Sequence, residues 1–275
     1  MPELTNPRAE RVKAVRALAG HPVRQRRGRF LVEGPQSVRE LVRHAPWRVE
    51  DLFCTPAAAE RYPEIVVAAQ RGELTVQLAS DDVLAAMSSD ARGVLAVAVT
   101  WAETLDAVLV TRPRLVAVLA AVRDPGNAGT VIRAADAAGA DAVVLVGQSV
   151  DLFNPKVVRA TAGSLFHLPV VRGGAVPDVV ARLQAARLTV LAADGAGALD
   201  LDVLQDGATG AGRTAGVDLR APTAWLFGNE AWGLPTEDRD LADAVVRVPI
   251  RGRAESLNLA TAAAVCLYAS ARAQR

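Results

Sequence analysis

The sequence has few aromatic residues, few cysteines and no long apolar runs, and each shortage narrows the class of protein. Aromatic residues make up 4% of the 275 residues, although hydrophobic residues make up 51%. A core built mainly from Ala, Val and Leu favours contacts between helices and a sheet over an aromatic-rich β sandwich. The two cysteines, Cys54 and Cys266, fit no metal-ligand spacing and indicate a reducing compartment without disulfides.

Signals for membranes, targeting and metals are also missing. No stretch approaches the roughly 18 uninterrupted apolar residues of a membrane-spanning helix. Met1 is followed by polar and charged residues instead of an apolar signal core. We therefore expect a cytoplasmic protein with no membrane partner. The three histidines, His21, His44 and His167, show no ligand spacing along the chain, so no metal site is expected.

The charge of the chain is unevenly distributed. The net charge is +1, but residues 1–50 carry eleven Lys or Arg against five acidic residues, a net charge of +6. A basic N-terminal segment on a balanced chain is typical of a phosphate-binding module. An arginine-rich, solvated surface is the ordinary alternative, and charge alone leaves both interpretations open.

The first hundred residues alternate between helical and strand patterns. Helices are expected over 6–19, 36–44, 57–70 and 80–87, and strands over 30–32, 49–54, 74–78 and 93–99. A connecting helix is expected over 101–111, and Arg112-Pro113 marks a boundary. The expected organisation is a substrate-binding domain over 1–100, a linker over 101–112 and a second domain over 113–275.

The second half contains unbroken apolar runs with helical patterns between most of them. The runs cover 115–122, 142–146, 168–171, 188–193, 223–227 and 244–248, and a last helix is expected over 256–272. Runs without alternation predict strands that are buried on both faces, and hence an α/β fold with a mostly parallel sheet. The glycine-rich stretch 194–220 predicts a long, irregular insertion.

A first group of polar residues follows the strand expected over 115–122. Asn127 is suited to cap the next helix, and Gly129 removes a side chain where the backbone could approach a ligand. Arg133 is a cation on an otherwise apolar helix. Asp136, three residues on, is its ordinary partner. A phosphate or a developing oxyanion is the functional alternative, because it matches the shape of a guanidinium.

Common nucleotide-binding motifs are absent. Leu145-Val146-Gly147 is not followed by the glycines of G-x-G-x-x-G, and the sequence has no G-x-x-x-x-G-K-[ST] loop. NAD and ATP chemistry are therefore disfavoured. A second group of residues lies instead after the strands expected over 223–227 and 244–248, at the ends where open α/β sheets bind ligands. It comprises Gly228-Asn229-Glu230, Pro249 to Gly252, and Ser256-Leu257-Asn258, of which Ser256 is suited to cap the last helix.

Read in order, these fragments resemble the SpoU (TrmH-type) branch of the SPOUT RNA methyltransferases. The family carries N-x-G-x-x-x-R, then G-N/A-E-x-x-G, then P-x-x-G-x-x-x-S-L-N. The matching residues, within about 113–275, are Asn127, Gly129, Arg133, Gly228, Glu230, Gly233, Pro249, Gly252, Ser256, Leu257 and Asn258. A shorter match from Arg29 to Gly34 resembles the family's small substrate-binding domain of ribosomal-protein L30e type.

The resemblance implies a trefoil-knotted α/β domain that binds S-adenosylmethionine in a bent conformation. It also implies methyl transfer to a ribose 2′-hydroxyl, with ribosomal RNA as the first expectation and transfer RNA as the second. Family members are dimers packed through the knotted domain, so a homodimer is expected. Cofactor contacts are expected from Leu226, Gly228, Val248, Ile250 and Leu257.

The same resemblance gives Arg133 the main catalytic role. Because arginine side chains stay protonated at neutral pH, we expect Arg133 to bind an RNA phosphate and stabilise the developing alkoxide. Asn127, Glu230, Ser256 and Asn258 would position it. Glu230 could hold Asn127 or the helix start, or orient Arg133; a carboxylate that accepts from local turn amides is the ordinary alternative. RNA contacts are expected from Arg24, Arg26, Arg27, Arg29, Lys156 and Arg159; for Lys156 and Arg159 a solvated helix face is the ordinary alternative.

Two other functions compete with this interpretation. A non-catalytic RNA-binding protein could keep the fold, although the intact motif residues Arg133, Glu230, Ser256 and Asn258 speak against it. A base methyltransferase could use the same fold, although N-x-G-x-x-x-R points to ribose. The sequence names neither the RNA molecule nor the nucleotide.

Overall fold

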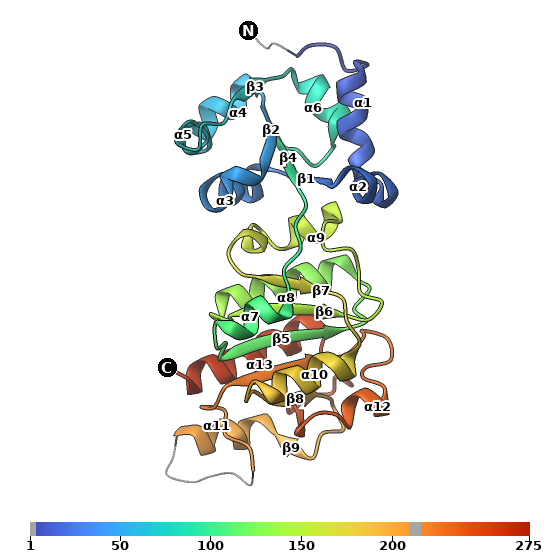
Figure 1. The fold of residues 1–275 in the computed structure, drawn as a ribbon, viewed down its shortest axis with the longest axis vertical. Coiled ribbons are helices and arrows are strands. Elements are labelled where there is room, and N and C mark those ends of the chain that lie inside the picture. Colours follow the sequence, from blue (N-terminus) through green and yellow to red (C-terminus); the bar gives the residue numbers. More distant parts are fainter. Residues whose placement is uncertain (1–3, 210–215) are drawn as a thin grey trace. The chain divides into compact units, whose positions relative to one another are not determined.

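The computed structural model describes residues 4–209 and 216–275, and its contacts divide the chain into two compact units (Figure 1). The first unit comprises Met1–Trp101 and Asp151–His167, and the second comprises Ala102–Val150 and Leu168–Arg275. The sequence placed all of 113–275 in one domain, whereas Asp151–His167 groups with the first unit. Apolar packing explains this grouping, because the Phe153 ring lies 4.6 Å from Phe30 and 5.0 Å from Trp101, centroid to centroid.

The first unit contains a four-stranded mixed sheet in the order β1-β4-β2-β3. The central strand β4 is antiparallel to β1 and β2, and β3 is parallel to β2. The strands are β1 (Arg29–Glu33), β2 (Val49–Cys54), β3 (Val76–Leu78) and β4 (Val94–Val99). The helices are α1 (Glu10–Arg16), α2 (His21–Arg27), α3 (Pro35–His44), α4 (Pro56–Arg61), α5 (Pro63–Arg71), α6 (Asp81–Met87) and α9 (Pro155–Ala160).

Local chemistry explains where these helices depart from expectation. The single helix expected over 57–70 is two helices, because Tyr62 leaves the helical conformation and Pro63 opens α5. The helix expected over 6–19 is shorter, and α2 was not expected. Helix α3 is amphipathic: Val38, Leu41 and Val42 are buried, so the opposite face of this helix is left to polar side chains.

The second unit contains a seven-stranded sheet in the order β7-β6-β5-β10-β8-β11-β9, and every described pair is parallel. The strands are β5 (Leu115–Ala120), β6 (Ala142–Val146), β7 (Val170–Arg172), β8 (Thr189–Ala193), β9 (Leu199–Asp200), β10 (Thr223–Phe227) and β11 (Ala244–Arg247). The helices are α7 (Leu105–Val110), α8 (Pro125–Ala137), α10 (Val176–Ala185), α11 (Leu201–Thr209), α12 (Thr236–Arg239) and α13 (Leu259–Ala273).

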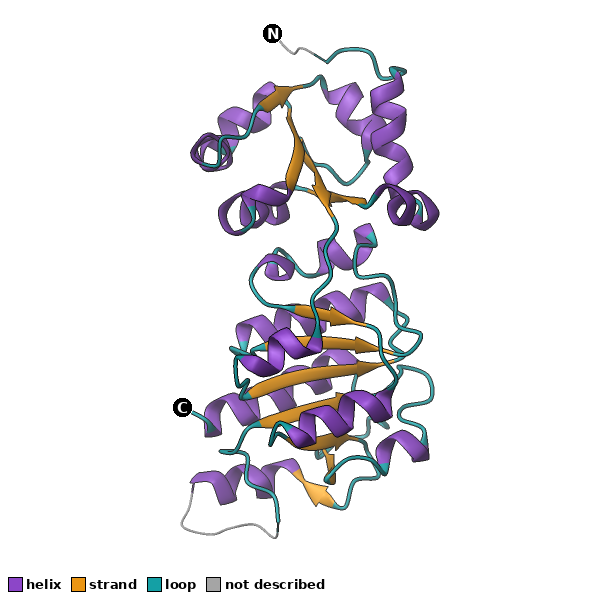
Figure 2. Cartoon of the chain, in the orientation of Figure 1, coloured by secondary structure: helices purple, strands orange, loops and turns teal. Residues whose placement is uncertain are grey.

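Helices cover both faces of this sheet (Figure 2). Apolar residues of α7 and α10 form a core with Val116, Val118 and Leu226 on one face. On the other face α13 packs against α8, β5 and β10, and Nε1 of the buried Trp225 donates a hydrogen bond to Ser270 (2.9 Å). The predicted α/β fold with a mostly parallel sheet is confirmed. Among the described residues, no helix combines the length and the apolar character that crossing a membrane requires.

The glycine-rich stretch 194–220 is more regular than expected. It contains β9 and α11, and residues 210–215 lie outside the described part of the chain. Leu201 and Leu204 are buried, which explains why a helix forms here. At Gly197 a β-carbon would lie 2.7 Å from the backbone nitrogen of Arg247, so the close approach of these two backbones requires glycine.

Candidate active site at the carboxyl ends of the second sheet

The turn that follows β10 is closed by backbone hydrogen bonds and by a glycine. Asn229 and Gly233 exchange two backbone bonds of 2.9 Å. A β-carbon on Gly228 would lie 2.3 Å from the carbonyl carbon of Gly233, so the turn cannot close around a larger residue. The buried Asn229 donates through Nδ2 to the carbonyl oxygen of Ala121 (2.7 Å), which fixes the turn to the end of β5.

Asn127 does not cap α8 as expected. Asp124 is the capping residue, and its Oδ1 accepts from the backbone nitrogen of Asn127 (2.7 Å). The Asn127 side chain is therefore available for other contacts. Its Nδ2 donates to Oε1 of Glu230 (3.2 Å), and its Oδ1 accepts from Nδ2 of Asn258 (3.0 Å). Glu230 also accepts from the backbone nitrogen of Asp124 (3.3 Å).

The last helix is capped by Asn258, where Ser256 was expected. Helix α13 begins at Leu259, and Oδ1 of Asn258 accepts from the backbone nitrogen of Ala260 (2.9 Å). One carboxamide thus caps α13 and also bonds to Asn127. Glu230, Asn127 and Asn258 form a hydrogen-bonded chain across three segments that are far apart in the sequence, one from each of the three motifs.

A cavity of about 480 Å³ lies beside this chain of hydrogen bonds. A site of this volume is within the usual range for a small-molecule ligand, about 300–1,000 Å³. Its lining includes Gly228, Val248, Ile250, Leu257, Ser256, Glu230 and Asn258, together with Phe227, Asp194, Gly195 and Glu255, which sequence reasoning did not select. Ile250 and Leu257 are 38% and 37% exposed, so apolar surface faces the cavity without cover.

Leu226 does not line the cavity, contrary to expectation. Its side chain is buried in the core with α7 and α10. Side chains of a strand alternate between the two faces of the sheet, and the next residue, Phe227, is the one that lines the cavity.

Arg133 is exposed on α8, and its environment differs from both sequence-based interpretations. Within residues 4–209 and 216–275 no ion pair joins it to Asp136 or to another acid. It also forms no hydrogen bond with Asn127, Glu230, Ser256 or Asn258 in this part of the chain, and it does not line the cavity. Its guanidinium is thus open to a ligand that comes from outside the chain.

Sequence reasoning missed two residues near this network. Arg123, next to Asp124, holds its guanidinium carbon 5.2 Å from the ring centre of Trp232, a distance at which a cation–π contact forms. Trp232 is 54% exposed although it is large and partly apolar. The available signal was an aromatic residue inside the glycine-bounded turn 228–233.

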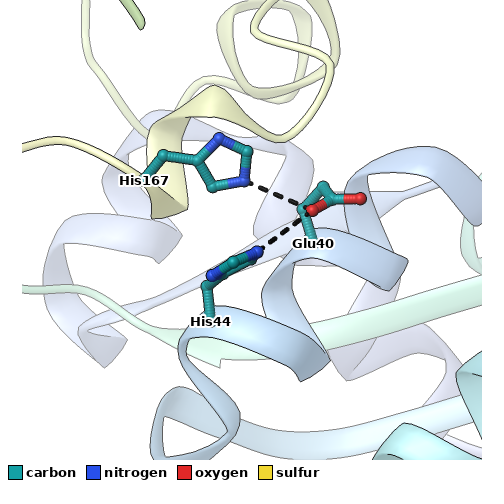
Figure 3. Close-up of side chains that lie close together, drawn as sticks. All are labelled: Glu40, His44 and His167. Atoms are coloured by element: carbon teal, nitrogen blue, oxygen red, sulfur yellow. Dashed lines mark hydrogen bonds and ion pairs between the residues drawn. The ribbon is translucent and has the colours of Figure 1, made fainter. Parts of the chain in front are cut away.

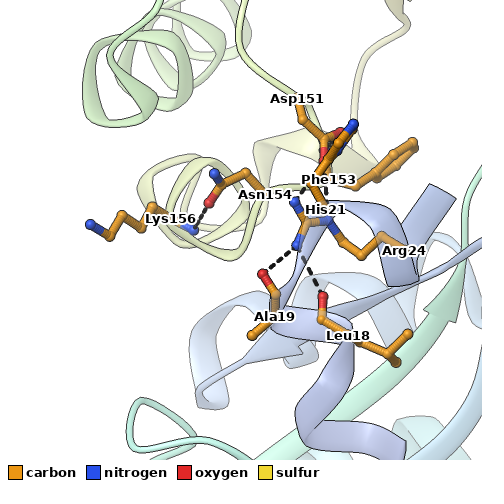
Figure 4. Close-up of polar contacts among 8 residues, drawn as sticks. All are labelled: Leu18, Ala19, His21, Arg24, Asp151, Phe153, Asn154 and Lys156. Carbon is orange, nitrogen blue, oxygen red and sulfur yellow. Dashed lines mark hydrogen bonds and ion pairs between the residues drawn. The ribbon is translucent and has the colours of Figure 1, made fainter.

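Arg24 is a buried residue with a structural role, and its polar contacts are drawn in Figure 4. Its side chain is 4% exposed. It donates to Oδ2 of Asp151 from Nε (3.1 Å) and Nη2 (2.8 Å), and to the backbone carbonyls of Leu18 and Ala19. Burial alone would raise the pKa of Asp151, but hydrogen bonds from His21, Arg24 and the backbone of Phe153 outweigh burial and lower it. The expected RNA contact at Arg24 is therefore corrected.

The other candidates for RNA contacts fall into two groups. Arg29 is paired with Glu50, and Arg159 with Glu33 and Asp90, all within the first unit. Arg26, Arg27 and Lys156 are exposed, and none has an ion pair among the residues that the structure describes. The charges of Arg26, Arg27 and Lys156 are therefore available to a ligand.

Neither cysteine is suited to be a nucleophile. Burial raises the pKa of the Cys54 thiol to about 11 and that of Cys266 to about 12. Both stay protonated at neutral pH, and the thiolate is the reactive form.

The fold and the cavity together define an α/β domain with a cavity of small-ligand size at the carboxyl ends of parallel strands. The second and third motifs line this cavity, and Asn127 of the first is hydrogen-bonded to both of them; the three motifs are those of one family. The chain belongs to the SpoU rRNA Methylase family, whose model matches residues 114–268. Residues 9–96 match an MRM3-like substrate binding domain.

Full-length relatives agree with this assignment. The chain is 32% identical over 268 residues, 98% of each chain, to 23S rRNA (guanosine(2553)-2'-O)-methyltransferase RlmP of Bacillus subtilis (strain 168). It is 33% identical over 257 residues, 90% of this chain and 84% of the relative, to 23S rRNA (uridine(2479)-2'-O)-methyltransferase of Streptomyces viridochromogenes.

A solved structure extends the agreement to the fold and the cofactor. The SpoU methyltransferase AviRb from Streptomyces viridochromogenes, in complex with AdoMet, superposes with a TM-score of 0.80 at 31% identity, over 96% of this chain and 98% of that chain. The family predicted from the sequence is confirmed, and with it the class of S-adenosylmethionine-dependent RNA methyltransferase.

Proposed function

We propose that this chain methylates a ribose 2′-hydroxyl of 23S ribosomal RNA. The observation that carries the proposal is the hydrogen-bonded chain Glu230–Asn127–Asn258, which joins the three family motifs beside a cavity lined by Glu230 and Asn258. Two relatives similar over most of their length are named for 2′-O-methylation of 23S rRNA. They differ in the nucleotide, so the target nucleotide of this chain is a matter for experiment. Transfer RNA stays the second candidate.

The cavity is suited to hold S-adenosylmethionine. Phe227, Val248, Ile250 and Leu257 offer apolar surface for an adenine ring, and Asp194, Glu230 and Glu255 offer carboxylates for cationic and hydroxyl groups. Bound there, S-adenosylmethionine supplies a methyl group on a positively charged sulfonium. We include in the proposal that the second unit is knotted and holds the cofactor bent, as in the family.

Arg133 is proposed to act on the RNA. A ribose hydroxyl is a poor nucleophile, so positioning and charge stabilisation are the means by which the protein can accelerate the reaction. The exposed guanidinium of Arg133 has no competing ion pair in the described ranges, and its planar fork matches a phosphate. It binds the RNA phosphate and stabilises the developing alkoxide, while the hydroxyl proton passes to a phosphate oxygen or to water.

Trp232 and Arg123 are proposed as a stacking platform for a base near the target ribose. Proteins that select single-stranded RNA stack splayed bases on aromatic rings and guanidinium planes. Trp232 is half exposed and lies in the same turn as Glu230, while Arg123 lies just before the start of α8. Their cation–π contact orders both side chains before RNA arrives.

The first unit is proposed to dock the RNA through Arg26, Arg27 and Lys156, whose charges are not neutralised by neighbours in the described chain. Deletion of residues 1–100 is a poor test of this role. Asp151–His167 belongs to the same compact unit, so the truncation would expose Phe153 and leave Asp151 without Arg24. Charge-removing substitutions in the full chain are the better probe.

We also propose a homodimer that packs through α13. Val265 and Tyr268 are 40% and 49% exposed on this helix, beside a groove of about 520 Å³ that α8 also borders through Ala137. Exposed apolar side chains that line one groove are typical of an interface. Light scattering should give the mass of two chains for the wild type and of one chain for Val265→Asp.

The function is tested by mapping 2′-O-methyl sites on RNA from cells with and without this protein. One site in 23S rRNA should disappear with the protein and return with the wild-type gene. A lost site in transfer RNA would select the second candidate, and nucleoside mass spectrometry showing a methylated base would reject the ribose. If calorimetry detects no S-adenosylmethionine binding, the non-catalytic alternative is favoured.

A further inference from the structure

Two of the three histidines of the chain meet one glutamate on the surface of the first unit (Figure 3). Nε2 of His44 lies 3.4 Å from Oε2 of Glu40, and Nε2 of His167 lies 3.3 Å from the same oxygen. All three ligand atoms lie within 4.8 Å of one another. Spacing along the chain could not reveal this cluster, because His167 is 127 residues from Glu40.

The fold brings these three side chains together in a defined way. Glu40 and His44 are four residues apart on α3, so they share one face of the helix. The buried face of α3 carries Val38, Leu41 and Val42, which directs Glu40 and His44 outward. His167 comes from the end of the segment Asp151–His167, which belongs to the same compact unit.

Gly163 allows this segment to approach Glu40 closely. Its φ is +104°, in the region that favours glycine. A β-carbon there would lie 2.5 Å from Cγ and 2.6 Å from Cβ of Glu40. The Cβ position is fixed by the α3 backbone, so rotation of the Glu40 side chain could not relieve that contact. The close approach therefore holds the carboxylate of Glu40 beside His167.

The distances fit metal ligands as well as they fit hydrogen-bonded ion pairs. Charge-assisted N–H···O bonds are usually about 2.7–2.9 Å long, whereas the two separations here are 3.3 and 3.4 Å. A tetrahedral zinc ion with ligand bonds of about 2.0–2.1 Å separates its donor atoms by about 3.3–3.4 Å. The His44 and His167 rings are edge-to-face with centroids 4.7 Å apart, and one ligand nitrogen of each lies within 4.8 Å of the other and of a carboxylate oxygen of Glu40.

We propose that Glu40, His44 and His167 bind one Zn²⁺ ion, which ties α3 to the segment Asp151–His167. Two imidazoles and one carboxylate are a ligand set that zinc accepts, with a fourth position left for water. The ion does not take part in methyl transfer in this proposal; its effect is to stabilise the first unit. Arg43 lies 3.9 Å from the other oxygen of Glu40, Oε1, and its charge opposes the ion.

The test is calorimetric titration of the chelator-stripped full chain with zinc chloride, with the thermal midpoint recorded at each zinc level. The wild type should take up one Zn²⁺ per chain, and its midpoint should rise. Glu40→Gln and His167→Asn should each weaken binding at least about tenfold. His21→Asn is the matched control because it removes the one histidine outside the cluster, and it should bind like the wild type. Arg43→Gln should bind more tightly.

Two results would overturn the proposal: no zinc uptake by the wild type, or uptake that the Glu40 and histidine variants leave unchanged. His44→Gln changes a side chain that is half exposed on its helix, so this variant should fold even if another variant does not. It should also bind zinc more weakly than the wild type. The measurements do not use methyl transfer, so their outcome is independent of the proposed function.

Discussion

Several arginines of the first unit are neutralised by carboxylates, whereas two arginines in the motif region of the second unit have no carboxylate partner in the described chain. In the first unit several arginines have an acidic partner; the pairs include Arg11–Asp51, Arg24–Asp151, Arg29–Glu50, Arg39–Glu64 and Arg159–Glu33. Arg123 follows β5, and Arg133 lies on α8. Neither has an ion pair within residues 4–209 and 216–275.

This difference shows that the charge of a segment is a poor guide to its binding surface. Residues 1–50 carry a net charge of +6, but Asp51, Glu64 and Asp151 lie outside that segment and pair with its arginines. A neutralised arginine stabilises structure, whereas one without a partner can bind phosphate. The predictions below test whether the two groups of arginines have these two roles.

The largest expected effect is on stability, at the buried pair of the first unit. Asp151→Asn should lower the free energy of unfolding by about 3–5 kcal/mol, because it leaves the Arg24 guanidinium buried without its counter-charge. Urea denaturation measures the effect. Arg29→Gln, at a pair whose side chains are 42% and 37% exposed, is the control and should cost less than about 1 kcal/mol.

The same pair predicts a dependence on pH. The pKa of Asp151 is lowered in the folded protein, so its contribution is present above about pH 4, the pKa of an unfolded aspartate, and is lost as the pH falls through the folded pKa. The difference in stability between the wild type and Asp151→Asn should therefore shrink in acid. A difference that stays constant from neutral pH into strong acid would contradict this origin.

The next largest effect is on catalysis, at Arg133. Arg133→Ala should lower turnover about 100- to 1,000-fold, the usual cost of removing one charge-stabilising donor, with little change in stability because the side chain is exposed. Arg182→Ala, on α10 and paired with Asp106, is the matched control and should stay near wild-type turnover. Arg133→Lys keeps the charge but not the fork; turnover close to wild type would exclude any role that needs the guanidinium.

The sequence-based predictions that the structure corrects have a common physical cause. Apolar runs located the strands well, and that over 223–227 matches β10 residue for residue. Side-chain partners could not be predicted in the same way. Asn127 and Ser256 are good capping residues, but Asp124 and Asn258 are placed to accept from the free amides. Arg24 meets Asp151 across 127 residues, a contact that depends on tertiary structure and leaves no local signal.

A smaller effect is expected at the aromatic residue of the site. Trp232→Ala should weaken RNA binding by about 1–3 kcal/mol, the usual contribution of one stacked base, and should leave S-adenosylmethionine affinity unchanged because Trp232 does not line the cavity. Trp47→Ala is the corresponding variant in the first unit, where Trp47 is 74% exposed. If Trp47→Ala weakens RNA binding as much and Trp232→Ala does not, the stacking platform is assigned to the wrong unit.

The smallest effect is expected at the arginines of the first unit that have no ion pair, and it is visible in the salt dependence of RNA binding. Each phosphate contact with single-stranded RNA contributes about 0.7 to the slope of log K against log salt. Arg26→Gln and Arg27→Gln should each reduce that slope by about this amount, whereas Arg29→Gln should leave it nearly unchanged, because Glu50 already neutralises Arg29.

The three positions lie within four residues of one another in the sequence, so a difference between them reflects pairing and not location. Equal slopes for all three variants would mean that ion pairs in the free protein open when RNA binds, and that the comparison between paired and unpaired arginines does not identify the RNA-binding surface.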